Sequence, residues 1–249
     1  MVGAAAAADA VARARRLPRL RVGLHLVLVD GRPVLPPERV PDLVNENGEF
    51  SGRLARAGMR FFFLPRVRRQ LKDEIRAQFQ AYRATGLALD HVNAHKHMHL
   101  HPTVLGMILG IGHEFGMHAM RIPYEPLRAS RRITADGHWT RFSGQALLRP
   151  WVRLLEWRVR RAGVSYNQYV FGLSTSGAMD EDTLLRIVDC LPPGVSEIYF
   201  HPATAADAGT PPTAVKHQAA ELQALTSPRV RSALAAADIQ SISFSELHR

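Results

Sequence analysis

Cysteine and lysine are nearly absent from this chain of 249 residues. Cys190 is the one cysteine, which excludes a disulfide framework or a cysteine-based zinc site and fits a reducing compartment. All but three of the 32 basic residues are arginine, and with 22 acidic residues the formal net charge is +10. This excess fits either an arginine-rich composition or, because guanidinium groups bind phosphate and carboxylate well, an anionic partner.

Long apolar runs and the common catalytic motifs are lacking as well. No run of 18 apolar residues occurs, and the alanine-rich start does not resemble a signal peptide because no basic residue precedes it and Asp9 interrupts it. A glycine-rich phosphate loop, a G-x-S-x-G motif and an H-E-x-x-H motif are all missing. We therefore expect a cytoplasmic protein, with contact at the inner membrane surface as a further expectation.

Two tryptophans, Trp151 and Trp157, lie among arginines in one segment, residues 148–161. The pattern is typical of a membrane-surface or acidic-partner helix, and equally of a core-packing helix with a solvated basic face; we favour the second reading. Aromatic residues interleaved with a basic stripe occur nowhere else, so we expect no nucleic-acid partner.

Apolar patterns predict strands and helices in alternation. The predicted strands are residues 21–29, 89–95, 119–123, 169–173, 195–200 and 240–244. The predicted helices are an N-terminal one ending near Pro18, then 64–85, 102–116, 147–161, 180–190 with Asp180 as its N-cap, and 213–237. Residues 31–60 and 124–144 read as loops. The order indicates an α/β fold with a mostly parallel sheet or barrel, in a single domain of residues 1–249.

Histidines gather where three predicted strands end. Five of the twelve lie within residues 91–101, and His25 and His201 follow two other strands. The carboxyl ends of parallel strands share one edge, where ligands bind, and imidazole is the commonest metal ligand. Alternate residues from 91 to 99 would face one side of an extended segment. A metal would use only two or three of these imidazoles. The alternatives are an exposed histidine-rich loop and, for His25 or His201 alone, an ordinary packed or surface histidine.

Four short motifs follow one another along the chain. They are Gly-Leu-His-Leu at 23–26, Asn-Ala-His-x-His-x-His at 93–99, Met-Arg-Ile at 120–122 and Phe-His-Pro-Ala at 200–203. In this order they resemble the YdjC-like carbohydrate deacetylases over nearly the whole chain. The stretch at 27–37 is most similar to the branch associated with hopanoid biosynthesis.

This resemblance implies a fold, an activity and partners. The implied fold is a distorted (β/α) barrel similar to the polysaccharide deacetylases. The implied activity is hydrolysis that depends on a divalent metal ion, Mg²⁺ or Zn²⁺, and removes an acetyl group from an N-acetylated sugar, here a hopanoid-linked amino sugar. The partner would then be an N-acetylated sugar or glycolipid substrate, and a homodimer is a further expectation.

The resemblance also implies roles for four residues. His25 and His95 match the family's two metal-binding histidines. His201 matches a histidine that acts as an acid or an orienting group, and Arg121 matches a basic position near the substrate.

One family motif is missing from the sequence. The family opens with a strand ending in Ala-Asp-Asp-Phe-Gly, whose aspartates complete the metal site and supply the base, and no such motif occurs here. We therefore expect the chain to lack its first β-α unit, about 30 residues long, through an internal start codon, a truncated gene or genuine shortening. An apolar groove beside strand 21–29 is expected to follow. Without those aspartates, we do not expect robust activity of these 249 residues. The alternative function is a non-catalytic sugar- or lipid-binding remnant of the same fold.

Overall fold

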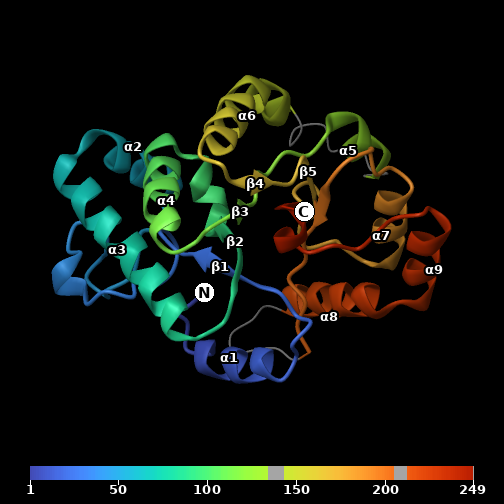
Figure 1. Ribbon diagram of the computed structural model, residues 1–249, viewed down its shortest axis with the longest axis horizontal. Coiled ribbons are helices and arrows are strands. Elements are labelled where there is room, and N and C mark those ends of the chain that lie inside the picture. Colours follow the sequence, from blue (N-terminus) through green and yellow to red (C-terminus); the bar gives the residue numbers. More distant parts are fainter. Residues whose placement is uncertain (134–142, 205–211, 249) are drawn as a thin grey trace. The chain divides into compact units, whose positions relative to one another are not determined.

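The computed structural model describes residues 1–133, 143–204 and 212–248, which form two compact units. The first unit comprises Met1–Arg121, Leu154–Tyr166 and the C-terminal segment from Ser243. The second unit comprises Ile122–Arg153 and Asn167–Ile242. Figure 1 shows the alternation of strands and helices along the chain.

The first unit contains a parallel sheet of four strands in the order β1-β2-β3-β4. These strands are β1 (Val22–Leu26), β2 (Leu89–Ala94), β3 (Ala119–Met120) and β4 (Ser165–Tyr166). Each neighbouring pair is parallel. The expected α/β class with a parallel sheet is therefore confirmed, and every strand of this sheet presents its carboxyl end at the same edge.

Helices surround this sheet and bury its apolar side chains. The helices of the first unit are α1 (Ala7–Arg15), α2 (Leu54–Phe63), α3 (Pro65–Ala84) and α4 (Pro102–Glu114), and the C-terminal part of α6 (Ser143–Arg161) belongs to it too. Helix α3 contacts β1, α2 and α4. The fully buried side chains of this core are Leu24, Leu26, Leu71, Ile75, Leu105, Ile108 and Met120.

Strand β1 ends at Leu26, earlier than the apolar run 21–29 predicts. The reason is that the backbone groups of Val27 bond to a helix side chain instead of to β2. The amide of Gln78 on α3 accepts from the Val27 N–H at 2.9 Å and donates to the Val27 carbonyl at 2.7 Å. Residues 27–29 are buried but lie outside the strand. A helix side chain thus replaces the sheet ladder and satisfies buried backbone groups that would otherwise be costly.

Two polar residues one turn apart on α3 hold the long connection after β1. The carboxylate of Glu74 accepts from the Val34 and Leu35 N–H groups at 2.8 and 3.0 Å. Gln70 accepts from the Asp42 N–H at 2.9 Å. Burial raises the pKa of Glu74 above its usual value, although these bonds oppose the shift. The stretch 31–60 is largely irregular, as expected, but it also contains the start of α2, which ends where Leu64 turns extended before Pro65.

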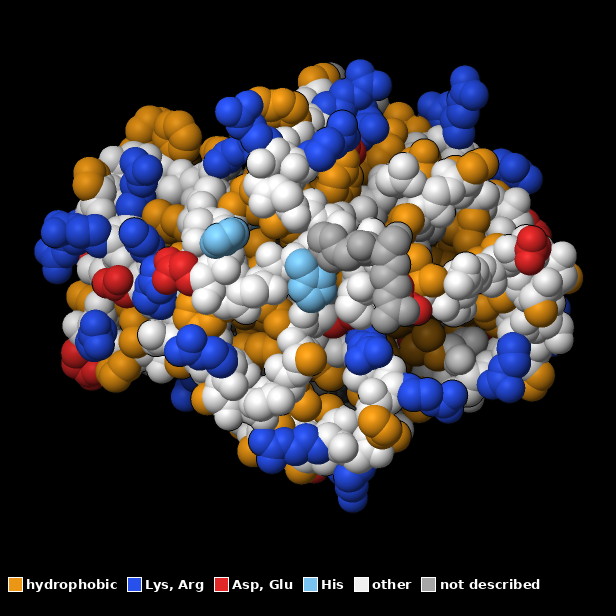
Figure 2. Space-filling model, viewed as in Figure 1, with side chains coloured by type: hydrophobic (Ala, Val, Ile, Leu, Met, Phe, Trp, Pro, Cys, Tyr) orange, Lys and Arg blue, Asp and Glu red, His pale blue; other side chains and the backbone are white. Residues whose placement is uncertain are grey.

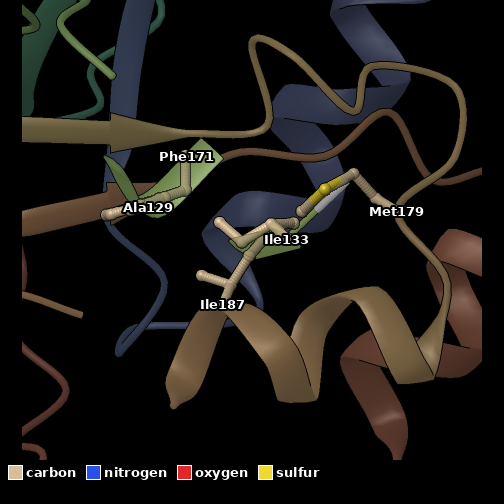
Figure 3. Close-up of a cluster of buried hydrophobic side chains, with 5 residues drawn as sticks. All are labelled: Ala129, Ile133, Phe171, Met179 and Ile187. Carbon is tan, nitrogen blue, oxygen red and sulfur yellow. The ribbon is translucent and has the colours of Figure 1, made fainter. Parts of the chain in front are cut away.

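The second unit has its own two-stranded parallel sheet. It pairs β5 (Tyr169–Phe171) with β6 (Ser196–Ile198). Its helices are α5 (Leu127–Ile133), the N-terminal part of α6, α7 (Glu181–Val188), α8 (Pro212–Thr226) and α9 (Pro228–Ala236). Figure 3 shows an apolar cluster of Ala129, Ile133, Phe171, Met179 and Ile187, which joins α5 to β5 and α7.

Three sequence-based expectations about elements are wrong and one is confirmed. Asp180 caps α7 as expected, accepting from the Thr183 N–H at 2.9 Å. Residues 124–144 are not all loop because they include α5, while residues 134–142 lie outside the described ranges. The helix expected at 213–237 is divided at Ser227, which caps α9 before Pro228. The strand expected at 240–244 does not form: residues 240–243 are irregular, and a 3₁₀ turn, Phe244–His248, begins at its last residue.

An apolar cavity of about 630 Å³ lies beside β1. Its lining includes Val11 of α1, Leu20, Val22 of β1 and Tyr82 of α3. Among the described residues, β2 is the only strand that pairs with β1.

Basic side chains are spread over the face of the molecule in Figure 2, with apolar side chains between them. None of the described helices combines the length and the apolar character that crossing a membrane requires.

Candidate functional site

His25 and Asn93 lie opposite each other on adjacent strands. They are register partners in β1 and β2, and the His25 Nδ1 and Asn93 Oδ1 atoms are 2.6 Å apart. Asn93 is buried and His25 is half-buried. Burial lowers the pKa of His25 to about 4, because it outweighs the Asn93 hydrogen bond that acts in the opposite direction. His25 is therefore a neutral imidazole at pH 7, which is the form that binds metals.

His95 comes directly after β2 and meets His25 at the carboxyl edge of the sheet. The two ring centroids are 5.7 Å apart, with the ring planes at 73°. The structure thus brings together the two histidines that the sequence placed at strand ends.

The histidine run does not continue as an extended segment. Residues His95–Leu100 form a 3₁₀ turn in which Lys96 and His97 have φ angles of 50° and 54°. Left-handed backbone is uncommon for residues other than glycine, and the expected alternation therefore ends at Ala94. The turn sends His99 back to the strand, where the Ala94 N–H donates to its Nδ1 at 3.1 Å.

His99 is a buried neutral imidazole beneath this edge, only 1% exposed. Its pKa lies well below the usual value because of burial, and the nearby charges of His97, Arg121 and His25 add to the shift. No partner of its Nε2 atom is found among the described residues. Its hydrogen bond from the Ala94 N–H therefore ties the 3₁₀ turn to the end of β2.

Arg121 lies next to the same strands. Its backbone N–H donates to the Val92 carbonyl at 3.0 Å, and its side chain is 8% exposed. Its positive charge contributes to the lowered pKa of both His25 and His99. The expected substrate contact of Arg121 stays a prediction, but its guanidinium belongs to the same unit as the two histidines.

The other clustered histidines make different contacts. His91 is two residues before Asn93, and its ring stacks on Phe244. His101 packs edge-on against Phe61 and Phe62, with centroid distances of 6.1 and 6.2 Å. Within the cluster, it is therefore His95 whose ring meets that of His25.

Asp30 is a neighbour of the site that the sequence did not single out. It follows the apolar run after β1, and its Oδ2 atom is 3.8 Å from His95 Nε2 and 3.6 Å from Lys96 Nζ. The Asp30-Gly31 pair after a strand is a turn signal, and nothing in its sequence context marks it as a partner of His95.

His201 belongs to the second unit. Its side chain is exposed, its backbone N–H donates to the Glu221 carboxylate, and its ring meets Tyr199 edge-on at 5.4 Å. Its expected catalytic role stays a prediction.

The two imidazoles satisfy part of what a metal ion requires. Their nitrogen donors and neutral state suit Zn²⁺, which usually takes three protein ligands at a catalytic site, whereas Mg²⁺ prefers oxygen ligands. Within residues 1–133, 143–204 and 212–248, no group of three His, Cys, Asp or Glu side chains is placed to hold a metal ion. His25 and His95 therefore do not form a complete centre by themselves.

Residues 1–236 match the profile of the YdjC-like proteins, and the chain therefore belongs to the YdjC-like family. The family expected from the four motifs is confirmed.

Two relatives are named carbohydrate deacetylases. The one from Brevibacillus brevis is 29% identical over 245 residues, covering 96% of this chain and 82% of the relative. The one from Geobacillus stearothermophilus is 35% identical over 151 residues, covering 59% of this chain and 56% of the relative. The second match thus spans little more than half of that protein's length.

A solved structure shares the fold. It comes from Enterococcus faecalis V583 and is named as a cellobiose-phosphate cleavage protein. It superposes with a TM-score of 0.68 at 22% identity, covering 96% of this chain and 82% of that chain.

Proposed function

We propose that the chain hydrolyses the acetamide of an N-acetylated sugar, releasing acetate and the free amine. The observation that carries this proposal is the edge-on pair of His25 and His95 at the carboxyl ends of adjacent parallel strands. The names of the two deacetylase relatives support it.

In this proposal His25 and His95 are two ligands of a divalent ion, Mg²⁺ or Zn²⁺, whose remaining ligands are not supplied by the described groups. The chemistry such an ion supplies is polarisation of the amide carbonyl and activation of water. The low pKa of His25 keeps its imidazole available as a neutral donor. Arg121 would bind the sugar, and His201 would protonate the departing amine.

The experiment that tests this function is acetate release from oligosaccharides of N-acetylglucosamine. The protein is stripped with a chelator and supplied with Zn²⁺ or Mg²⁺. We expect metal-dependent release that His25→Ala and His95→Ala abolish, while the exposed His113→Ala retains it. His201→Ala should lower kcat by about 100-fold or more, the usual contribution of a general acid. Sugar binding without acetate release would contradict hydrolysis and favour the non-catalytic sugar-binding alternative.

The finer parts of the proposal concern substrate, fold and setting. We propose that the sugar is a hopanoid-linked amino sugar, which a parallel assay with a hopanoid-linked N-acetylglucosamine would test. Closure of the strands into a distorted barrel, a homodimer and a cytoplasmic location also stay predictions.

Contact with a membrane surface is proposed for the C-terminal part of α6. Leu154 and Trp157 are exposed there, and the Arg161 guanidinium lies over the Trp157 ring at 5.6 Å. Exposed apolar and basic side chains on one helix are typical of interfacial binding. Sedimentation with anionic vesicles tests this: Trp157→Gln should weaken binding, and equal binding by the variant would contradict it.

A further inference from the structure

Three hydrogen bonds link Asp90 to His25 along the sheet. His91 Nδ1 lies 2.9 Å from Asp90 Oδ2, and His91 Nε2 lies 3.4 Å from Asn93 Nδ2. Asn93 Oδ1 lies 2.6 Å from His25 Nδ1. The chain Asp90–His91–Asn93–His25 crosses from β2 to β1 and ends at an imidazole of the candidate site.

The chemistry of each group fixes the direction of these bonds. An ionised carboxylate only accepts, so the Nδ1 of His91 carries the proton and donates to Asp90. The Nε2 of a neutral His91 is then an acceptor, and it takes a hydrogen from the Asn93 amide nitrogen. This leaves the Asn93 oxygen facing His25, whose Nδ1–H donates to it.

A hydrogen bond and a ring contact hold the Asp90–His91 end of this network. The second oxygen of Asp90 accepts from the Ser245 N–H at 3.0 Å. The His91 ring stacks on Phe244 with a centroid distance of 4.3 Å and an interplanar angle of 25°. Asp90 and Asn93 are 5% and 7% exposed, so water competes little for these bonds.

We propose that Asn93, supported by His91 and Asp90, is the positioning residue that holds His25 as the Nδ1-protonated tautomer with a bare Nε2 lone pair. The inference rests on the proposed function in one respect, namely that the Nε2 lone pair is what a metal ion would bind. Histidines that bind metals commonly donate their other ring N–H to a fixed acceptor, and loss of that acceptor weakens binding.

The first test reads the tautomer in the metal-free protein, so it does not depend on metal binding. Protein labelled with ¹⁵N in histidine is examined by long-range ¹H–¹⁵N correlation at pH 8, where an ordinary histidine is neutral. The His25 signals are identified by their loss in His25→Gln. We expect a protonated Nδ1 and an unprotonated Nε2. A His25 protonated at Nε2 in the wild-type protein would overturn the proposal.

Variants separate the two bonds that Asn93 makes. Asn93→Leu removes the acceptor, and His25 should shift toward the Nε2-protonated tautomer that free histidine prefers in water. Asn93→Asp keeps an acceptor and should preserve the Nδ1-protonated form. An unchanged tautomer in Asn93→Leu would overturn the role of Asn93. The signals of the exposed His113 serve as an internal reference and should not move.

The role of His91 has its own variant. His91→Phe retains a ring to stack on Phe244 but removes the nitrogen that accepts from Asn93. We expect a mixture of His25 tautomers, because the Asn93 side-chain amide can then rotate by half a turn and present either its oxygen or its nitrogen to His25. A fully Nδ1-protonated His25 in this variant would show that Asn93 acts without His91 and would overturn that part of the proposal.

The second test is a Zn²⁺ titration of the same proteins by calorimetry. Asn93→Leu should bind Zn²⁺ about 10- to 100-fold more weakly than the wild-type protein, and Asn93→Asp should recover most of the affinity. Wild-type protein that binds no Zn²⁺ would contradict the metal role in the proposed function, while the tautomer measurement would still decide the role of Asn93. Equal affinities for wild type and Asn93→Leu would overturn the inference.

Discussion

The ring of His91 occupies the space where a side chain on Gly23 would be. A Cβ atom built on Gly23 would lie 2.6 Å from His91 Cε1 and 2.7 Å from its Nε2. Gly23 precedes His25 by two residues on β1, so both residues face the same side of the sheet. The absence of a side chain at position 23 therefore makes room for the imidazole that hydrogen-bonds to Asn93.

Gly23→Ala should displace His91 and destabilise the protein by about 1–3 kcal/mol, the usual cost of overpacking. Urea denaturation measures the change. The matched control is Gly110→Ala in α4, an exposed helical position where the added Cβ would contact nothing within 4 Å. That variant should gain about 0.4–1 kcal/mol. Equal stabilities for the two variants would contradict the close approach of His91.

Gln78→Leu should cost about 2–4 kcal/mol of unfolding free energy, because it leaves the buried N–H and carbonyl of Val27 without their partner. Gln80→Leu is the control, since Gln80 is exposed on the same helix and should change stability by less than about 0.5 kcal/mol. Chemical denaturation of both variants decides. A similar loss of unfolding free energy in Gln80→Leu would attribute the effect to the change of residue type on α3 and not to the Val27 hydrogen bonds.

The stability of the protein should fall between pH 6.5 and pH 4 because of His25. Its pKa is about 4 in the folded protein and 6.5 as a model value, so in this window the unfolded chain binds the additional proton. The contribution is fully present above pH 6.5 and is lost as the pH falls toward 4. Between pH 7.5 and 4.5 the loss amounts to about 2–3 kcal/mol.

The measurement is denaturant unfolding at several pH values for the wild-type protein and His25→Gln, which cannot titrate. The variant should show a pH dependence smaller by that amount. The stability of His25→Gln should still decrease somewhat as the pH falls, because the pKa of the buried His99 is also lowered. Identical pH dependence in the two proteins would show that His25 titrates normally.

Asp180→Ala should destabilise the protein by about 1 kcal/mol, because the N-cap of α7 loses its bond from the Thr183 N–H. Asp180→Asn should restore most of that loss, since asparagine is an equally good N-cap. Thermal unfolding of the three proteins compares them. A loss in Asp180→Asn as large as in Asp180→Ala would attribute the effect to charge.

The pairing of His25 with His95 could be anticipated because strands of a parallel sheet end at one edge. The sequence cannot show where the alternation after Asn93 stops, since Lys96 and His97 adopt left-handed backbone without a glycine to mark it. Asn93 was visible on the expected face, but its partner lies 68 residues earlier in the chain. A bond of that kind depends on register, which apolar patterns do not specify.

Element ends were misjudged where a side chain replaces backbone pairing. The apolar run at 21–29 is buried throughout, so its pattern gives no hint that Gln78 takes over at Val27. The break between α8 and α9 was missed within the single helix expected at 213–237, although Pro228 is a residue favoured at the start of a helix. The 3₁₀ turn at the C-terminal end is stabilised by the Ser243 bonds to Glu246, which compete with an extended conformation.

The bond between Ser245 and Asp90 spans 155 residues of sequence. Closing so long a loop is entropically expensive, and contacts of this separation form slowly. Strands β1 and β2 alone therefore do not supply every partner of the network that ends at His25. We therefore expect the network behind His25 to be complete only when these two distant segments have come together, and amide hydrogen exchange at β2 should report the opening of that contact.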